Sequence, residues 1–569
     1  MNYQPTLSDF HFILHEVLQA PARLQVLPTF TEVDADLMRQ VLDEAGKFVG
    51  EVIAPLSRTG DEVGCQFANG QVTTPPGFKE AYQAFWQAGW PALACAPEDG
   101  GQGLPGVLEA VLYEMLSAAN HGWTMAPGLL HGAYECIKHH ASDELKARYL
   151  EKVATGEWLA TMCLTEPHAG SDLGLVRTRA VPQTDGSYHL SGTKIFISGA
   201  EHDLSDNIIH LVLARLPDAP PGPKGLSLFL APKYMPNGAR NPALCERIEE
   251  KMGLHGSATC VMRFDEATGW IVGTPGRGLN AMFVMMNAAR LHVALQGIGL
   301  LDAAWQKAHA YAQERRQMRA PGRDKSSMEA SLIIEHPAMR RILDTQRAWI
   351  DGGRVLAYTT ALELDIIKHH PESEPRIRAE RWCSLVTPVL KAAWTEQAFK
   401  GSSECMQVFG GHGYVREWGI EQIVRDSRVS MIYEGTNEIQ AIDLLVRKVL
   451  PDGGAGLTTL LQELSDKLVG TDVAAETFKT QVTVLCALTG KLVQASALDQ
   501  QLPYWVADDY LRAVAVTLLA WAWVQIRQTP TGDTSGPESA RWQHPEAALQ
   551  HWILPEFAMR VQIISARLP

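Results

Sequence analysis

The feature that most constrains the fold of this chain is a change in the spacing of its apolar residues, which occurs twice. Up to about residue 155 the apolar residues recur at intervals of three and four, which is typical of amphipathic helices. Over 157–275 the apolar runs are short or alternating and are separated by Gly, Pro, Asp and Asn, as in β-strands. Helical spacing then returns. The order predicts helices, a compact β domain and helices again, and excludes an alternating α/β fold.

These change points divide the chain into four parts. A further break, "PDGGAG" at 451–456, has the composition of a linker between helical segments. The fold class is therefore α+β and mainly α. The predicted parts are an N-terminal helical domain at 1–156, a central β domain at 157–277, a helical bundle at 278–450 and a helical extension at 451–569.

The extension contains five tryptophans within helical patterns. Side chains of this size are seldom left in solvent, so we expect them to pack on the main body or on a partner subunit. They are Trp505, Trp521, Trp523, Trp542 and Trp552.

Charge narrows the range of partners. The 569 residues carry a formal net charge of -14, and the extension has eight basic residues against twelve acidic ones. An acidic surface argues against nucleic acid or an anionic membrane as the main partner, while small anionic ligands remain possible. The apolar run "AVAVTLLAWAWV" is too short to span a bilayer, and the first residues lack the basic start of a signal peptide. We expect a cytoplasmic protein without a transmembrane segment.

Several short patterns match nucleotide-binding or metal-binding motifs only in part. "GQGLPG" at 101–106 matches a dinucleotide-binding motif in form, but no acidic residue follows about 20 positions later, so a turn is the better interpretation. The pairs His139-His140 and His369-His370 lack the spacing of metal ligands, and the nine cysteines form no CxxC pair. We expect reduced thiols and no metal site.

The stretch "MIYEGTNEIQ" at 431–440 allows two interpretations. In one, Tyr-Glu-Gly-Thr is a turn in which Gly435 takes a positive φ and Thr436 caps a helix. In the other, Glu434 is a catalytic base held in a partly apolar slot. Local sequence leaves both open.

Five motifs, in a fixed order, resemble the acyl-CoA dehydrogenase family. They are "CLTEPHAGSD", "LSGTKIFISG", "EKMGLHGSATC", "QVFGGHGYVREW" and "RDSRVSMIYEGTNEIQ". The resemblance covers about residues 35–450. The chain length, the N-terminal "FILHEVL" segment and the extension resemble the long bacterial branch, which includes enzymes for 3-methylmercaptopropionyl-CoA and for fatty acyl-CoAs.

The resemblance implies a β-barrel-like central domain, an FAD cofactor and a role in fatty acid oxidation. The implied reaction is dehydrogenation of an acyl-CoA to a trans-2-enoyl-CoA, with electrons passed to an electron-transfer flavoprotein. A homo-oligomer, most simply a homodimer, is implied as well. Two alternatives are a DNA-binding or damage-response flavoprotein of the same fold, which the acidic extension argues against, and an acyl-CoA oxidase.

The resemblance also implies roles for individual residues. Glu434 falls on the catalytic base, and Arg290 on an arginine near the base and the thioester, for which a structural ion pair is the rival reading. Arg315 falls on an arginine that reaches the FAD pyrophosphate of a neighbouring subunit. The other implied FAD contacts are Met162, Leu164, Thr165, Gly170, Ser171, Phe196, Ser198, Gln407, Gly410, Gly411, Thr436 and Glu438.

The sequence departs from the family pattern at three places. Met162 stands where an aromatic residue is frequent, and Phe196 where tryptophan is frequent, which makes the implied flavin wall softer but still apolar. His168 replaces a frequent glycine. The residues after Arg315, "RQMRAPG", differ from the usual pattern, so this assignment rests on the arginine alone.

Overall fold

The chain forms two compact units in a computed structural model that describes residues 2–323, 329–468, 473–529 and 539–569. The barrel unit consists of Phe48–Glu109 and Ala119–His292. The bundle unit consists of Met1–Lys47, Ala110–Ala118 and Val293–Pro569. Three helices have residues in both units: α3 (Ala35–Phe48), α6 (Gly106–Thr124) and α9 (Gly278–Glu314).

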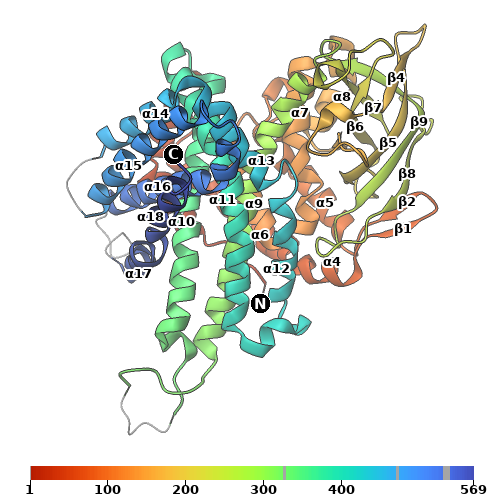
Figure 1. The fold of residues 1–569 in the computed structure, drawn as a ribbon. Helices are drawn as coiled ribbons and strands as arrows, with labels where there is room; N and C mark the ends of the chain where they lie inside the picture. The colour runs from red at the N-terminus through yellow and green to blue at the C-terminus, as the bar shows by residue number, and fades with distance from the viewer. Residues whose placement is uncertain (1, 324–328, 469–472, 530–538) are drawn as a thin grey trace. The chain divides into compact units, whose positions relative to one another are not determined.

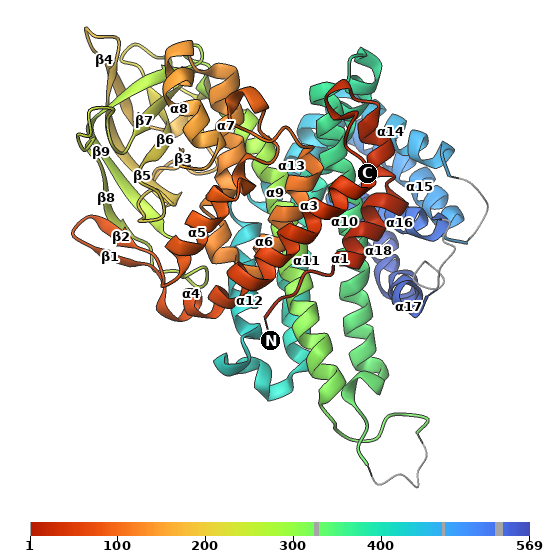
Figure 2. The same cartoon turned by 180° about the vertical axis from the view of Figure 1, so that it is seen from behind.

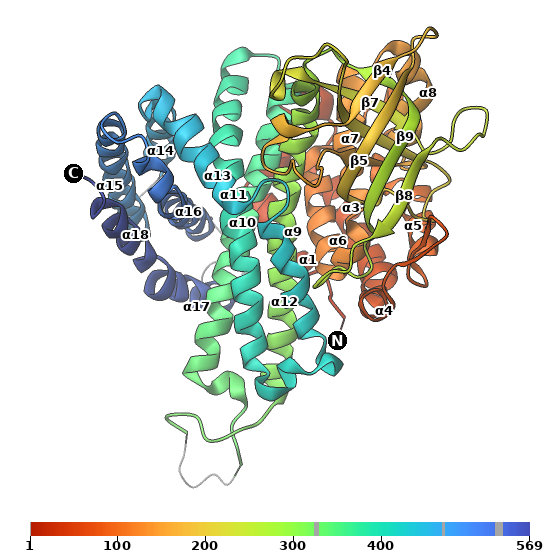
Figure 3. The ribbon, with the colours of Figure 1, turned by 45° about the vertical axis from the view of Figure 1, so that its right-hand side comes forward.

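The strands of the barrel unit close on themselves. β4 pairs with β5, β5 with β9, β9 with β7, β7 with β6, and β6 with β4, which completes a circuit. β5, β9 and β8 lie side by side in this unit (Figure 3). β3 adds in parallel to β6, and β8 lies antiparallel to β9. The β-barrel-like domain expected from the sequence is therefore present. Its strands are β3 (Leu159–Cys163), β4 (Arg179–Pro182), β5 (Tyr188–Ser198), β6 (Ile208–Arg215), β7 (Leu226–Pro232), β8 (Ala243–Ile248) and β9 (Thr259–Val272).

Burial explains why two of these strands read as continuous apolar runs. In β6 and β7 nearly every side chain is buried, so both faces need apolar residues, whereas a half-exposed strand would alternate. Helices and one small hairpin complete the unit. They are α4 (Ser57–Val63), β1 (Gln66–Ala68), β2 (Gln71–Thr73), α5 (Phe78–Gln87), α7 (Leu130–His140) and α8 (Asp143–Ala154).

The bundle unit is built around two long helices, α10 (Pro337–His369) and α11 (Ser373–Val408), which lie side by side (Figure 1). The helices of the extension, α14 to α18, belong to the same unit, and α16 packs on both α10 and α11. The remaining helices are α1 (Leu7–His11), α2 (Ala20–Gln25), α12 (Ile420–Arg428), α13 (Asn437–Ile442), α14 (Ala455–Asp466), α15 (Val473–Ser496), α16 (Leu502–Gln528), α17 (Ala540–Ala548) and α18 (Pro555–Ser565).

Three of the five tryptophans in the extension are buried, as expected. The indole N–H of Trp523 donates to the Ala348 carbonyl of α10 at 2.9 Å. Trp521 packs against Trp382 of α11 with ring centroids 5.5 Å apart, and Trp542 is also buried. These contacts attach the extension to the bundle through apolar packing.

The other two tryptophans are largely exposed in the single chain, so their packing on a partner subunit stays a prediction. Trp505 is 65% exposed and Trp552 is 50% exposed. Each instead has an arginine over its ring. Arg567 lies 5.3 Å from the Trp505 ring centroid, and Arg341 lies 3.9 Å from that of Trp552. A cation over the π face partly covers an indole without burying it.

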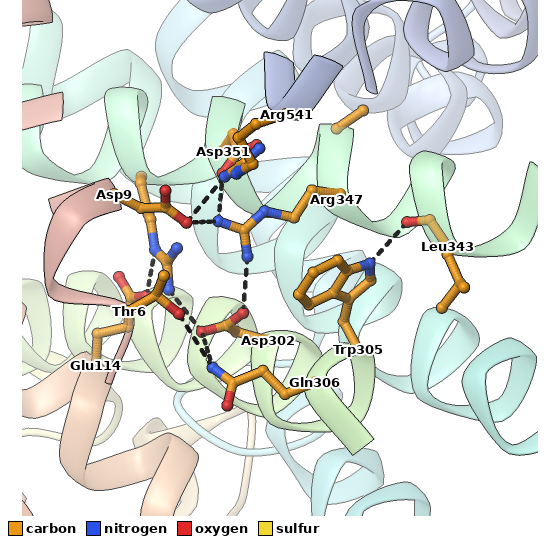
Figure 4. A network of polar contacts seen from close by, with 12 residues as sticks. Thr6, Asp9, Glu114, Asp302, Trp305, Gln306, Leu343, Arg347, Asp351 and Arg541 are labelled. Carbon is orange, nitrogen blue, oxygen red and sulfur yellow. Dashed lines mark hydrogen bonds and ion pairs between the residues drawn. The ribbon is translucent and has the colours of Figure 1, made fainter. Parts of the chain in front are cut away.

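A buried network of ion pairs crosses the bundle unit (Figure 4). Arg347 of α10 pairs with Asp9 of α1 and with Asp302 of α9, the latter at 3.0 Å. α1 thus lies against α10 (Figure 2). Arg541 of α17 donates to Asp9 at 3.0 Å and to Asp351 at 2.8 Å. One cluster therefore joins the start of the chain, the bundle and the extension.

The second half of the network centres on Arg354. Its guanidinium donates to Glu114 at 2.7 Å and to Asp302 at 2.8 Å, and all three side chains are buried. The Tyr358 hydroxyl also donates to Glu114. Because buried charges are costly unless they are paired, the network requires all of its members together.

None of the helices in the described segments has the length and apolar character needed to cross a membrane.

Candidate active site

Glu434 lies in a turn whose backbone is left-handed at two successive residues. Its φ is +54° and that of Gly435 is +82°. Left-handed geometry costs a non-glycine residue roughly 1–2 kcal/mol, so surrounding contacts must hold it. Thr436 ends the turn and caps α13, with its side-chain oxygen accepting from the Ile439 N–H at 3.4 Å. The features expected of a turn are all present, and they are compatible with a functional glutamate.

Two side chains hold this turn from inside the bundle unit. The Gln440 amide donates to the Glu434 carbonyl at 3.1 Å. The Lys391 ammonium donates to the Gly435 carbonyl at 2.7 Å and to the Asn437 side-chain oxygen at 3.0 Å. The φ of +82° at Gly435 favours glycine, and a Cβ atom there would come within 2.8 Å of the Gln440 amide nitrogen, which would have to move away.

Sequence reasoning missed both Lys391 and Gln440. One signal for Lys391 exists, because this lysine interrupts the apolar stretch "VTPVLKAAW" in the middle of α11. A charged residue on the buried face of a helix calls for a specific partner. The sequence does not say that the partner is a turn 44 positions away.

The residue before Glu434 extends the polar contacts of the turn. The Tyr433 hydroxyl donates to the Gln296 side-chain oxygen at 2.6 Å. Burial, and after it the charges of Glu434 and Asp426, raise the pKa of Tyr433 above its ordinary value. Tyr433 therefore remains a neutral hydrogen-bond donor. The Glu434 side chain itself is half-buried.

A second group of expected residues gathers at another part of the bundle unit. Tyr311, near the end of α9, stacks on Phe409 with centroids 4.4 Å apart and hydrogen-bonds His412 at 2.9 Å. These contacts hold the loop containing Gly410 and Gly411 beside the end of α9, from which Arg315 follows. Arg315, Gln407, Gly410 and Gly411 are exposed.

The exposed loop is suited to approach by a ligand. Gly410 has a φ of +58°, and a Cβ atom at Gly410 or Gly411 would meet nothing within 4 Å. An open backbone beside an exposed guanidinium suits a phosphorylated group. Thr436 and Glu438 lie on α13 or at its cap, with Thr436 half-buried and Glu438 exposed.

In the barrel unit, Phe196 is held open to solvent by its backbone. It has a φ of +60°, lies at the bulge between Lys194 and Ile197 and is 60% exposed. An exposed aromatic ring on a rigid strand suits a flat ligand. The Ile195 N–H, next to it, donates to the Thr165 carbonyl at 2.9 Å, so β5 and the loop after β3 are tied together.

The other residues expected in the barrel unit lie around this point. Met162 is buried in β3, Leu164, Thr165 and Ser198 are half-buried, and Gly170 and Ser171 are exposed. A Cβ atom on Gly170 would meet nothing within 4 Å. Arg290 is half-buried on α9. The structure thus divides the expected residues between the two units.

A buried ion pair organises the loop after β3, and sequence reasoning missed it. The Lys194 ammonium donates to Glu166 at 2.9 Å and to the Leu164 carbonyl at 2.9 Å. Glu166 also accepts from the backbone and hydroxyl of Thr178. Burial acts to raise the pKa of Glu166, but attraction by Lys194 and these hydrogen bonds outweigh it and lower the pKa.

The residues of each unit suit part of a flavin cofactor. In the barrel unit the exposed Phe196 ring suits a flat ring, and in the bundle unit the open glycine backbone and the exposed Arg315 suit a phosphorylated group. Within the segments that the structure describes, no three His, Cys, Asp or Glu side chains are grouped to hold a metal ion.

Comparison with known proteins decides the family. The family models for the N-terminal, middle and C-terminal domains of acyl-CoA dehydrogenase match residues 36–157, 161–267 and 276–449. A Ruegeria pomeroyi protein named 3-methylmercaptopropionyl-CoA dehydrogenase is 46% identical over 459 residues, covering 80% of this chain and 77% of that protein. This chain belongs to the acyl-CoA dehydrogenase family. It is an oxidoreductase that uses FAD and acts on an acyl-CoA.

One further relative supports this acyl-CoA dehydrogenase assignment, and one solved structure shows the same fold. A broad-specificity linear acyl-CoA dehydrogenase of Mycobacterium tuberculosis is 34% identical over 521 residues, which is 87% of this chain and 83% of that one. A Bacillus anthracis acyl-CoA dehydrogenase crystallised with FAD shares the fold, with a TM-score of 0.76 at 21% identity. That match covers 96% of this acyl-CoA dehydrogenase and 90% of the other chain, so the fold likeness includes most of the extension.

Proposed function

We propose that this enzyme removes hydrogen from the α and β carbons of an acyl-CoA, with Glu434 as the base. The observation that carries the proposal is the left-handed turn at Glu434, which is held by Lys391 and Gln440. A chain that maintains a strained glutamate in a half-buried place has a use for its carboxylate. The same residue falls on the base position of the family motif.

Glu434 would act in two ways. Its carboxylate takes the proton from the carbon next to the thioester, and its backbone N–H donates to the thioester oxygen as negative charge develops there. When bound, FAD supplies the acceptor for the hydride that leaves the β carbon.

The proposed FAD contacts follow the two groups of residues described above. In the barrel unit, the exposed Phe196 ring and the open backbone at Gly170 support a role for Met162, Leu164, Thr165, Gly170, Ser171, Phe196 and Ser198. In the bundle unit, exposure and open glycine backbone support a role for Arg315, Gln407, Gly410, Gly411, Thr436 and Glu438. We assign Arg290 to the neighbourhood of the thioester.

The substrate proposed first is 3-methylmercaptopropionyl-CoA, and a linear fatty acyl-CoA is the second candidate. The order follows the relatives, since the protein named for the thioether substrate is 46% identical and the one named for linear substrates is 34% identical. Electrons would pass to an electron-transfer flavoprotein. We propose a homodimer in which Arg315 reaches the FAD of the other subunit.

The test is anaerobic bleaching of the bound flavin by a panel of acyl-CoAs. The panel contains 3-methylmercaptopropionyl-CoA and linear acyl-CoAs of increasing length. Fastest bleaching by the thioether substrate supports the first candidate, and fastest bleaching by a linear one supports the second. Bleaching by none of them contradicts the proposed reaction. Reoxidation in air distinguishes an oxidase, which turns over rapidly with oxygen, from a dehydrogenase.

A further inference from the structure

Lys391 is a buried cation in contact with the turn that carries Glu434. Its exposed fraction is 0%, although lysine is among the residues least often buried. It lies in the middle of α11, and its ammonium donates to the Gly435 carbonyl at 2.7 Å and to the Asn437 side-chain oxygen at 3.0 Å. Hydrogen bonds from a charged donor are about twice as strong as neutral ones.

Asn437 makes the connection between α11 and the turn more rigid. Its side-chain oxygen accepts from Lys391 and, at 3.2 Å, from the Thr395 hydroxyl. Its amide nitrogen donates to the Ala392 carbonyl at 3.0 Å. The amide is therefore fixed in one orientation, with both ends bound to α11. Gly435 and Asn437, the two neighbours of Thr436 in the chain, are therefore both held by α11.

The position of these contacts determines what they restrain. Gly435 follows Glu434 directly, and both have positive φ. The Gln440 amide donates to the carbonyl of Glu434 at 3.1 Å and, more weakly, to that of Gly435 at 3.4 Å, whereas the Lys391 ammonium donates to the carbonyl of Gly435 at 2.7 Å. Loss of the Lys391 contact would remove the charged, shortest restraint on the carbonyl of Gly435 and let the strained backbone of Glu434 relax toward ordinary φ values.

We infer that Lys391 is a positioning residue for proton abstraction, which keeps the Glu434 carboxylate where it meets the α carbon. The inference rests on the proposed role of Glu434 as the base. A misplacement of about 1 Å is enough to slow a positioned reaction ~10²-fold. Lys391 acts through the turn and does not touch the substrate in this role.

The first experiment measures the turn itself by hydrogen exchange and mass spectrometry, on the FAD-loaded protein without substrate. Lys391→Met keeps the length of the side chain and removes its charge and its donors. We expect faster exchange in peptides covering residues 429–442 and unchanged exchange in the barrel unit. Lys400→Met, on the exposed side of the same helix, is the matched control and should change neither.

The second experiment measures flavin bleaching by a reactive acyl-CoA. With Lys391→Met we expect kcat to fall ~10²-fold, with KM and FAD content near those of wild type. In the Glu434→Gln background, Lys391→Met should cause no further fall, because the base that it positions is already absent. An additive fall would mean a general structural role and would overturn the inference.

The outcomes separate the two proposals. If Glu434→Gln bleaches at the wild-type rate, the base assignment fails, whatever the exchange data show. If Glu434→Gln is slow while Lys391→Met keeps both the wild-type kcat and wild-type exchange, only the positioning role fails. Should Lys391→Met not fold, Asn437→Ala removes the side-chain acceptor of Lys391 described above and should give a smaller change in the same direction. Wild-type exchange and rate in that variant also overturn the inference.

Discussion

The Arg541 guanidinium donates a hydrogen bond to the Asp9 carboxylate at 3.0 Å, across a sequence separation of 532 residues. Asp9 belongs to the first helix and Arg541 to the extension, and both join a buried network with Arg347 and Asp351. The extension is thus part of the ionic interior of the bundle unit. It is held there by charge as well as by its tryptophans.

Arg541→Met should destabilise the protein by ~3–5 kcal/mol, the usual cost of breaking a buried ion pair. The variant leaves Asp9 and Asp351 with fewer cations in a buried place. Urea unfolding measures the change. Arg378→Met, on the exposed side of α11, serves as control and should lie within ~0.5 kcal/mol of wild type. Equal stability of the two variants would contradict a structural role for the network.

Truncation after Pro451 should make the protein aggregate. Removal of the extension exposes the surfaces on which Trp521 and Trp523 pack, and it removes Arg541 from the acids that it pairs with. Size-exclusion chromatography and thermal melting provide the measurement. A truncated protein with unchanged solubility and melting would show that the extension is a separate module.

Glu434→Gln should lower turnover by at least ~10²–10⁴-fold, the range for loss of a general base. The substitution preserves shape and the backbone turn, so FAD and acyl-CoA should still bind. Flavin bleaching after anaerobic mixing gives the rate, and the flavin absorbance gives the occupancy. A rate near wild type would leave Glu434 with only its role in the turn.

Arg315→Ala should weaken FAD retention more than it weakens folding. Arg315 is exposed, so its removal disturbs little of the folded chain. Loss of a charged hydrogen-bond partner to a diphosphate typically costs ~1.5–3 kcal/mol. The ratio of flavin to protein absorbance after gel filtration reports retention, and light scattering of the same sample reports the dimer. Full retention would exclude Arg315 from the FAD site.

Glu166 should make stability depend on acid pH. Its folded-state pKa is lowered from the ordinary 4.5, so its contribution is fully present above that value and is lost as pH falls through the lower, folded pKa. Glu166→Gln should therefore be most destabilising at neutral pH, and the difference from wild type should shrink in acid. Unfolding free energies measured from pH 7 to pH 3 provide the check. A constant difference would contradict the buried pair with Lys194.

Much of the fold could be predicted because the spacing of apolar residues reports local structure directly. A serine just before a helical pattern predicts a cap, and the Ser142 side chain does accept from the Leu145 N–H at the start of α8. The small hairpin β1–β2 was missed, since the region was read as mostly helical. Its signal was present in Asn69-Gly70, both of which have positive φ, as a two-residue hairpin turn requires.

The site was less predictable because its geometry depends on distant contacts. Motif order places Glu434 and Phe196, but nothing local predicts a positive φ at either residue. The turn at Glu434 depends on Lys391, 43 positions earlier in the chain, and Phe196 depends on a bulge between paired strands. Such conformations follow from tertiary packing, which local sequence patterns do not report.

The pairing of Asp9 with Arg541 also has a consequence for synthesis on the ribosome. At about 5–20 residues per second, the two residues are made roughly half a minute to two minutes apart. During that interval the Asp9 carboxylate is without its distant arginine, and the surface that will receive α17 is uncovered. The bundle unit therefore completes its interior late in translation, after α17 has been made.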